Sequence, residues 1–236
     1  MSLRVRVGTS GYNYPEWKGS FYPADMKPAR MLPYYAERFS TVEINATFYR
    51  MPTATTVEGW AEAVPEAFTF VLKAPQRITH FARLRNVDEP LRFFCDTASL
   101  LRARLGPLFF QLPPNFKKDV PRLGDLLGQV PSGHRAAFEF RHESWFADDV
   151  YERLRARNAA LCIADTEKGS TPAVATADWG YLRLRAVDYT DAQLAEWLAT
   201  MRAIGGGFRD AFVFFKHEER GTGPALAKRF EALLTP

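Results

Sequence analysis

The chain has 236 residues and a formal net charge of +4, with 47% hydrophobic and 25% charged residues. This is the composition of an ordinary globular protein, and it excludes a disordered chain. No stretch approaches the roughly 18 apolar residues of a membrane-spanning helix, and the N-terminal segment lacks the apolar core of a signal peptide. We therefore expect one domain over residues 1–236, located in the cytoplasm, with no membrane partner.

The cysteines and the basic residues bear on the class of ligand. Cys95 and Cys162 lie in apolar runs without a CxxC partner, which favours buried, reduced thiols over a metal site.

Arginine accounts for 23 of the 31 basic residues, and its planar guanidinium group suits phosphate and carboxylate groups. A GC-rich genome would also enrich arginine, and no basic block stands out. Nucleic-acid binding is therefore possible but not favoured.

Short apolar, β-rich segments alternate with helical patterns along the chain. The predicted strands are Arg4–Ser10, Thr41–Thr47, Phe68–Ala74, Pro107–Leu112, Arg135–Arg141, Ala159–Asp165, Trp179–Arg185 and Asp210–Lys216. The predicted helices are Arg30–Phe39, Thr55–Val64, Glu89–Leu105, Pro121–Val130, Asp148–Asn158, Asp191–Ile204 and Pro224–Leu234. Eight such units predict an α/β fold, a single (β/α)8 TIM barrel, rather than an open sheet of five or six strands. Thr166–Asp178 contains helix breakers, so we expect a poorly helical connection after the sixth strand.

Alternation along the strands separates helix-facing apolar residues from an inward polar set. In the second strand the inward set is Glu43, Asn45, Thr47 and Tyr49. The same division selects Lys73, Gln111, Glu139, Arg141, Arg183 and Arg185. Most of these residues lie late in their strands, where barrel active sites form. Glu43 or Glu139 taken alone fits a structural ion pair equally well.

Two more strand ends supply candidate rim residues. Asp165 ends the sixth strand, and Lys216 and His217 end the eighth. Alternation leaves open which of the last two points inward.

Several separated motifs also carry a resemblance. They are VGTSGYNYPEWKGSFYP at 7–23, VEINATFYRMP at 42–52, FVLKAPQRITH at 70–80, FQLPP at 110–114, FEFRHESWF at 138–146 and YLRLR at 181–185. In these motifs the chain resembles the YecE-like family, known as domain of unknown function 72. The resemblance implies a TIM barrel and adds His80, His142 and Trp145 to the candidate residues near the C-terminal rim. It implies no established activity.

The leading hypothesis is an enzyme of hydrolase or lyase/isomerase type that acts on a small phosphorylated or carboxylated molecule by acid–base chemistry. The candidate catalytic residues are Glu43, Glu139, Asp165 and Lys73. The candidate substrate-binding residues are Asn45, Thr47, Tyr49, His80, Gln111, Arg141, His142, Trp145, Arg183, Arg185 and His217.

We expect no cofactor and no metal, because the basic residues would oppose a cation held by Glu43, Glu139, Asp165 and His217. Two other functions stay open. One is a phosphodiesterase or nuclease-like enzyme acting on nucleic acid, and the other is a non-catalytic ligand-binding or regulatory module. The oligomeric state is not indicated by the sequence.

Overall fold

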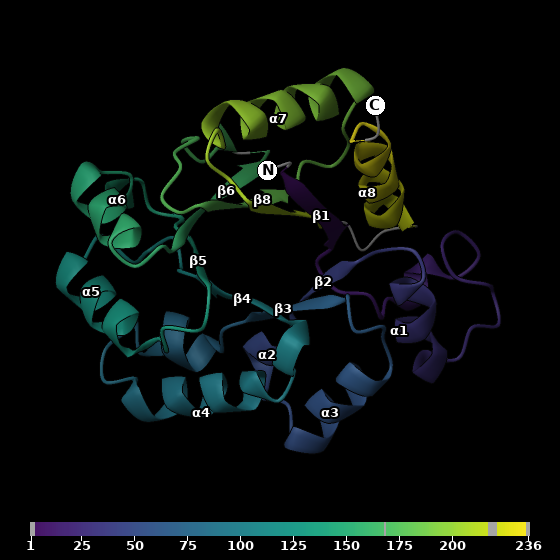
Figure 1. Cartoon of the computed structure of the whole chain (residues 1–236), viewed down its shortest axis with the longest axis horizontal. Helices are drawn as coiled ribbons and strands as arrows, with labels where there is room; N and C mark the ends of the chain where they lie inside the picture. The colour runs from purple at the N-terminus through teal and green to yellow at the C-terminus, as the bar shows by residue number, and fades with distance from the viewer. Residues whose placement is uncertain (1–2, 168, 217–220, 235–236) are drawn as a thin grey trace.

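The strands form a parallel barrel surrounded by helices (Figure 1). The computed structural model describes residues 3–167, 169–216 and 221–234. The barrel strands are β1 (Arg4–Thr9), β2 (Thr41–Ile44), β3 (Thr69–Lys73), β4 (Leu105–Gln111), β5 (Ala136–Glu139), β6 (Ala160–Thr166), β8 (Trp179–Leu184) and β9 (Asp210–Phe215). They pair in the order β1-β9-β8-β6-β5-β4-β3-β2. The predicted (β/α)8 barrel is confirmed.

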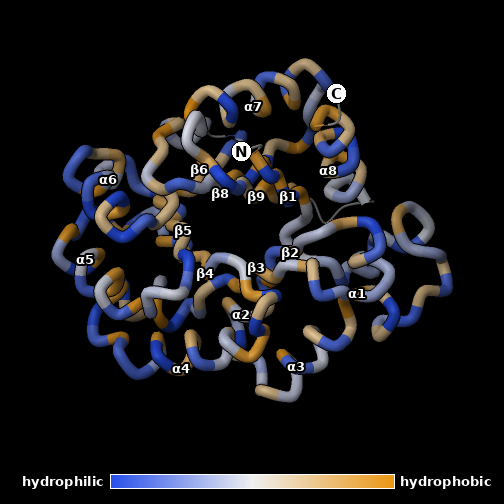
Figure 2. Tube along the Cα trace, in the orientation of Figure 1, coloured by the Kyte–Doolittle hydropathy of each residue, from blue (hydrophilic) through white to orange (hydrophobic). Residues whose placement is uncertain are grey.

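The helices pack around the strands with one face buried. They are α1 (Pro28–Ala36), α2 (Ala46–Tyr49), α3 (Ala54–Glu62), α4 (Asp88–Ser99), α5 (Val120–Gln129), α6 (Asp148–Arg155), α7 (Asp191–Ile204) and α8 (Thr222–Ala232). Hydrophilic and hydrophobic residues alternate along them in Figure 2, as expected for helices that cover a core. The side chains of Thr53, Asp119 and Thr190 accept backbone N–H groups at the starts of α3, α5 and α7, which fixes where these helices begin. Within the described residues, no helix has the length and apolar character needed to cross a membrane.

The connection after β6 departs from the strand–helix pattern. The two-residue strand β7 (Gly169–Ser170) turns back antiparallel to the end of β6, and no helix occurs in the described part of the segment before β8. The predicted poorly helical connection is thereby confirmed.

Alternation along the strands produces two separate hydrophobic layers. Val71, Phe109, Cys162 and Tyr181 belong to a small cluster inside the barrel. Their neighbours in sequence belong to the larger layer between strands and helices. Cys162 is therefore an interior residue, whereas Cys95 is buried in the helix layer, and both thiols are free.

Several predicted boundaries differ from the observed ones by two or more residues, and two of the differences change which element follows. The predicted strand Thr41–Thr47 ends at Ile44, because Asn45 already has helical dihedral angles and α2 follows it. The predicted helix Glu89–Leu105 ends at Ser99; a separate turn covers Arg102–Arg104, and Leu105 already begins β4.

A tyrosine hydroxyl helps to close the barrel between β1 and β2. Beyond β1, Ser10 forms a single bridge with Glu43. Nearer the start of β2, the Tyr35 hydroxyl accepts the backbone N–H of Thr9 at 2.8 Å and donates to the carbonyl of Thr41 at 3.1 Å. The two backbones are close here, since a Cβ atom at Gly8 would lie 2.2 Å from the Thr41 carbonyl oxygen. We call this contact the Tyr35 seam.

Candidate functional site

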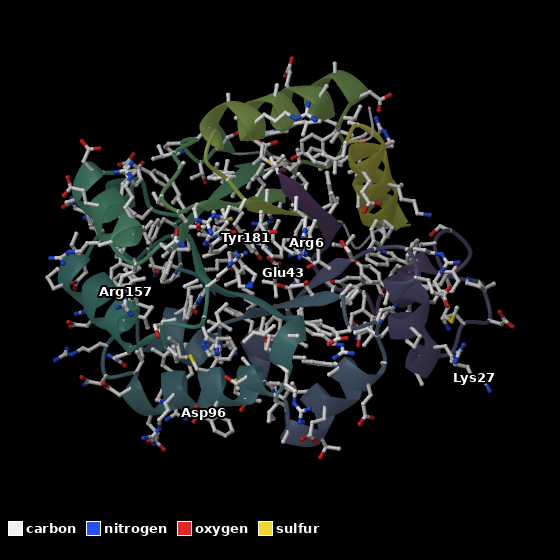
Figure 3. All side chains as sticks on the ribbon, viewed as in Figure 1. Arg6, Lys27, Glu43, Asp96, Arg157 and Tyr181 are labelled. Carbon is white, nitrogen blue, oxygen red and sulfur yellow. The ribbon has the colours of Figure 1, made fainter. Side chains whose placement is uncertain are left out.

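A buried arginine on β8 binds two carboxylates from other strands. Arg183 donates to Glu43 of β2 at 2.8 Å and to Glu139 of β5 at 2.5 Å. The Tyr181 hydroxyl donates to the other oxygen of Glu43 at 2.5 Å. Figure 3 shows Glu43 and Tyr181 toward the centre of the barrel, whereas Lys27, Asp96 and Arg157 lie outside it. The residues Glu43, Glu139, Tyr181 and Arg183 are the charged centre of the barrel.

Glu139 is also held from the rim side. Gln111 of β4 donates to it at 2.7 Å, and Arg141 donates at 2.9 Å. The Arg185 guanidinium lies 3.8 Å from the same carboxylate. Both oxygens of Glu139 therefore have hydrogen-bond donors.

These contacts fix the charge states in the centre. Burial alone would raise the pKa of Glu139, but Arg183, Arg141 and Arg185 outweigh it and hold this pKa well below its ordinary value. Burial alone would lower the pKa of Arg183, but Glu43 and Glu139 outweigh it and hold this pKa above its ordinary value. Glu139 and Arg183 therefore stay charged at neutral pH.

Lys73 ends β3 beside this centre. Its amine donates to Gln111 at 2.9 Å and lies 4.1 Å from the centre of the Phe48 ring. Burial, followed by repulsion from Arg183, lowers the pKa of Lys73 to about 7. The Lys73 amine therefore exchanges its proton near neutral pH.

Two cavities open at the C-terminal ends of the strands on either side of the centre. One, of about 460 Å³, is lined by Lys73 and by Asn45, Tyr49 and Trp60. The other, of about 480 Å³, is lined by Glu139, Arg141 and Arg185 together with the loop around Ser170. Both volumes are typical of sites for small molecules.

The structure brings together most of the predicted inward set. Those in mutual contact or near contact are Glu43, Lys73, Gln111, Glu139, Arg141, Arg183 and Arg185. His80 packs on Phe48, and burial, Lys73 and Arg141 lower its pKa to about 4. His80 is therefore neutral beside the site. Tyr49, which is 74% exposed, contacts the outer part of the lysine cavity.

Asp165 lies outside this arrangement. It shares a face of β6 with Leu161 and Ile163, which pack in the layer between strands and helices, so it is on the outer face of the strand. Its carboxylate accepts the hydroxyls of Ser170 and Tyr189 at 2.6 and 2.7 Å. The candidate catalytic residue Asp165 is therefore not in contact with the charged centre and instead holds the loops after β6 and β8.

Thr47, His142 and Trp145 make local structural contacts. The Thr47 hydroxyl contacts the carbonyls of Ile44 and Lys73, because the chain turns into α2 instead of continuing as a strand. Trp145 is fully buried and donates to the carbonyl of Phe116. His142 accepts the backbone N–H of Ser144. His217 lies outside the described residues.

Tyr181 and Phe48 contact the charged groups but were not predicted as site residues. The alternation that selects Arg183 and Arg185 also selects Tyr181, so its position was available from the sequence. Phe48 reaches Lys73 because of the α2 turn, and alternation assigned it to the helix side. Across residues 3–167, 169–216 and 221–234, no three His, Cys, Asp or Glu side chains lie together as metal ligands would.

Comparison with known proteins gives relatives without a stated activity. The UPF0759 protein YecE of Escherichia coli K12 is 31% identical over 150 residues, which are 63% of this chain and 53% of that protein. The chain thus spans about half the length of this curated relative. A DUF72 family protein from Thermotoga maritima is 26% identical, with a TM-score of 0.83 over 99% of this chain and all of that one.

A more distant likeness concerns the fold alone. D-allulose 3-epimerase from a Methylomonas species, solved with D-allulose, matches 98% of this chain and 91% of its own, with a TM-score of 0.54 at 17% identity. A family model described as "Protein of unknown function DUF72" matches residues 6–236. Since that match spans nearly the whole chain, the protein belongs to the DUF72 family.

Proposed function

We propose that the protein is an enzyme that converts a small molecule carrying a carboxylate or phosphate group, by acid–base chemistry at the C-terminal rim. The observation that carries the proposal is the arrangement of basic groups beside the two rim cavities. Lys73, Arg141, Arg183 and Arg185 outnumber Glu43 and Glu139, and Lys73, Arg141 and Arg185 also line cavities. An anion would balance the excess positive charge.

Arg141 and Arg185 are the proposed anion holders. Each carries a guanidinium near Glu139, which limits its movement and leaves other donors for a ligand. The Arg185 Nε is buried and has no hydrogen-bond partner among the described residues, although such groups are normally satisfied. The Arg183 Nε is likewise buried without a partner among the described residues, but its two terminal nitrogens bind the two carboxylates and it lines neither cavity, so it fits a positioning role.

Lys73 is the proposed proton-transfer group. A base works best when its pKa lies near the working pH, and the pKa of Lys73 is about 7. Glu139 fits this role poorly, because three guanidinium groups hold its charge. The two glutamates are then positioning residues that fix the arginines.

The test is a binding screen of small phosphate- and carboxylate-bearing molecules by calorimetry, with and without chelator, followed by a turnover assay of each binder. We expect binding without added metal and a loss of roughly tenfold or more in affinity in Arg141→Ala. Lys73→Met should abolish turnover while leaving binding within a few fold. Arg30→Ala, which removes an exposed arginine from α1, is the matched control.

Several results would contradict the proposal. They are anion binding that disappears with chelator, no anion binding at all, and equal losses in Arg141→Ala and Arg30→Ala. Binding without turnover of any ligand would favour the non-catalytic module instead.

A further inference from the structure

A second basic cavity lies at the opposite end of the barrel, where the strands begin. It has a volume of about 530 Å³ and is lined by four arginines and a single carboxylate. These residues are Arg4, Arg6, Arg102, Arg135 and Asp210. Arg4 and Arg6 lie in the first half of β1, Asp210 begins β9, and Arg135 directly precedes β5. The cavity therefore shares no lining residue with the rim cavities.

The carboxylate neutralises only part of this charge. Asp210 is bound by Arg6 at 2.8 Å and by Arg135 at 2.9 Å, one arginine on each oxygen. In the described part of the chain, the exposed side chains of Arg4 and Arg102 make no ion pair. A structural ion pair with Asp210 thus accounts for the presence of Arg6 and Arg135 in the cavity wall, but not for that of Arg4 and Arg102.

The cavity also has features of a built site. The Arg6 guanidinium lies 5.4 Å from the centre of the Phe212 ring, and that of Arg135 lies 5.6 Å from the Trp179 ring, so aromatic faces restrict both. The Nδ1 atom of His134 is buried without a partner among the described residues, while its other ring nitrogen lies 3.0 Å from the Ser99 hydroxyl. A buried ring nitrogen in this condition indicates a site for water or a ligand.

Backbone strain at Arg102 is a further observation. Its φ of 53° lies in the left-handed region, where a residue with a Cβ is strained and glycine is favoured. Strained residues of this kind concentrate at ligand sites. Here the strained residue contributes a guanidinium to the cavity wall.

We propose that this cavity binds a small molecule through two or more linked phosphate groups. Several arginines from three parts of the chain can each form paired hydrogen bonds with phosphate oxygens, whereas a single carboxylate would engage only one of them. The volume suits a ligand of up to about the size of a mononucleotide. The site is independent of the proposed function at the rim.

The test is calorimetric titration of the full chain with pyrophosphate. Arg4→Ala/Arg102→Ala should lower the affinity at least tenfold, and Arg30→Ala should leave it unchanged. Arg141→Ala, at the other end of the barrel, should also retain this binding. Equal losses in the Arg30 and Arg4/Arg102 variants, or no loss in the latter, would overturn the proposal.

A second variant separates folding from binding. Arg102→Gly relieves the strained φ, so it should melt at the same or a higher temperature than the wild type while still losing affinity for pyrophosphate. Unchanged affinity in this variant would remove Arg102 from the site. Displacement of pyrophosphate by a short single-stranded oligonucleotide of higher affinity would overturn the small-molecule assignment.

Discussion

The buried carboxylate of Glu139 is surrounded by more hydrogen-bond donors and positive charges than a surface carboxylate usually has. It accepts hydrogen bonds from Gln111, Arg141 and Arg183, with Arg185 close by. Replacing it with glutamine would leave Arg183 buried with one carboxylate fewer. We therefore expect Glu139→Gln to lose roughly 3–5 kcal/mol of unfolding free energy, measured by urea denaturation.

The matched control is Glu37→Gln. Glu37 is 67% exposed and pairs with Arg38 at the surface, so this change should cost less than about 0.5 kcal/mol. A Glu139→Gln protein as stable as the wild type would contradict the structural role. It would return Glu139 to the position of a candidate base.

The lowered pKa of Lys73 makes a prediction about stability against pH. The folded lysine titrates near pH 7 and the unfolded one near 10.5, so between these values the unfolded chain binds more protons and the wild type gains stability as the pH rises. Below about pH 7 both states are charged and the full cost of burying the charge remains. Lys73→Met should therefore be more stable than the wild type at pH 6, by a margin that shrinks from pH 7 to 10.

Urea denaturation at pH 6, 8 and 10 measures this margin. Lys27→Met, which removes an exposed amine outside the barrel, controls for loss of a lysine as such. If the difference in unfolding free energy between Lys73→Met and the wild type stays constant or grows with pH, burial of the charged Lys73 amine does not destabilise the folded protein.

The sequence predicts which side chains gather at this site but not what they do there. Strand alternation is local, so it correctly grouped Lys73, Gln111, Glu139 and Arg183. The binding partners of Arg183 come from β2 and β5, far away in the chain, and no local pattern encodes that choice. Asp165 was selected for its place at the predicted end of the strand, although its spacing from Leu161 and Ile163 already assigns it to the helix face.

At the scale of elements, the Tyr35 seam joins α1 to β1 and β2. Among the described residues, these two strands are otherwise paired only through the bridge between Ser10 and Glu43. Removing the hydroxyl leaves the buried N–H of Thr9 and the carbonyl of Thr41 without this partner. We expect Tyr35→Phe to cost about 1–3 kcal/mol in urea denaturation. Hydrogen exchange of the Thr9 amide should accelerate by more than that of the β8 and β9 amides.

Tyr34→Phe on the same helix is the control for this experiment. Its hydroxyl has no hydrogen-bond partner within the described residues, so the change should stay within about 0.5 kcal/mol. Equal effects of the two changes would show that the seam depends on ring packing rather than on the hydroxyl.

Element types were easier to predict than their ends. The apolar periods of 2 and 3.6 residues identify strands and helices, but β2 ends early because Asn45 turns the chain into α2. The alternation of polar and apolar residues in Thr41–Tyr49 does not predict that turn. The consequence was local. Phe48 faces Lys73 instead of the helices and Thr47 contacts backbone carbonyls, while Glu43 points inward as predicted.

For the whole molecule, the two cysteines report on cooperativity. Cys95 is in the helix layer of the first half of the chain and Cys162 is inside the barrel in the second half. Burial raises the pKa of both thiols, that of Cys95 to about 12, so neither should react quickly in the folded protein. If residues 1–236 form one domain, both should become reactive to a thiol reagent at the same urea concentration.

Separate labelling of Cys95→Ser and Cys162→Ala measures the two midpoints independently. Midpoints that differ after correction for the stability of each variant would show two units that unfold separately. The barrel would then not be a single cooperative domain.

Arg183 also has a consequence for the kinetics of the protein. The two junctions with fewest strand pairs are β1–β2, with one bridge, and β5–β6, with two pairs, and they divide the barrel into a half from β2 to β5 and a half formed by β6, β8, β9 and β1. Glu43 and Glu139 lie on the two edge strands of the first half, and Arg183 reaches both from the second. Separating the halves would break both contacts between Arg183 and the carboxylates, so we expect this triad to raise the barrier to unfolding. We therefore expect the Arg183–Glu43–Glu139 triad to affect the lifetime of the folded state more than its equilibrium stability.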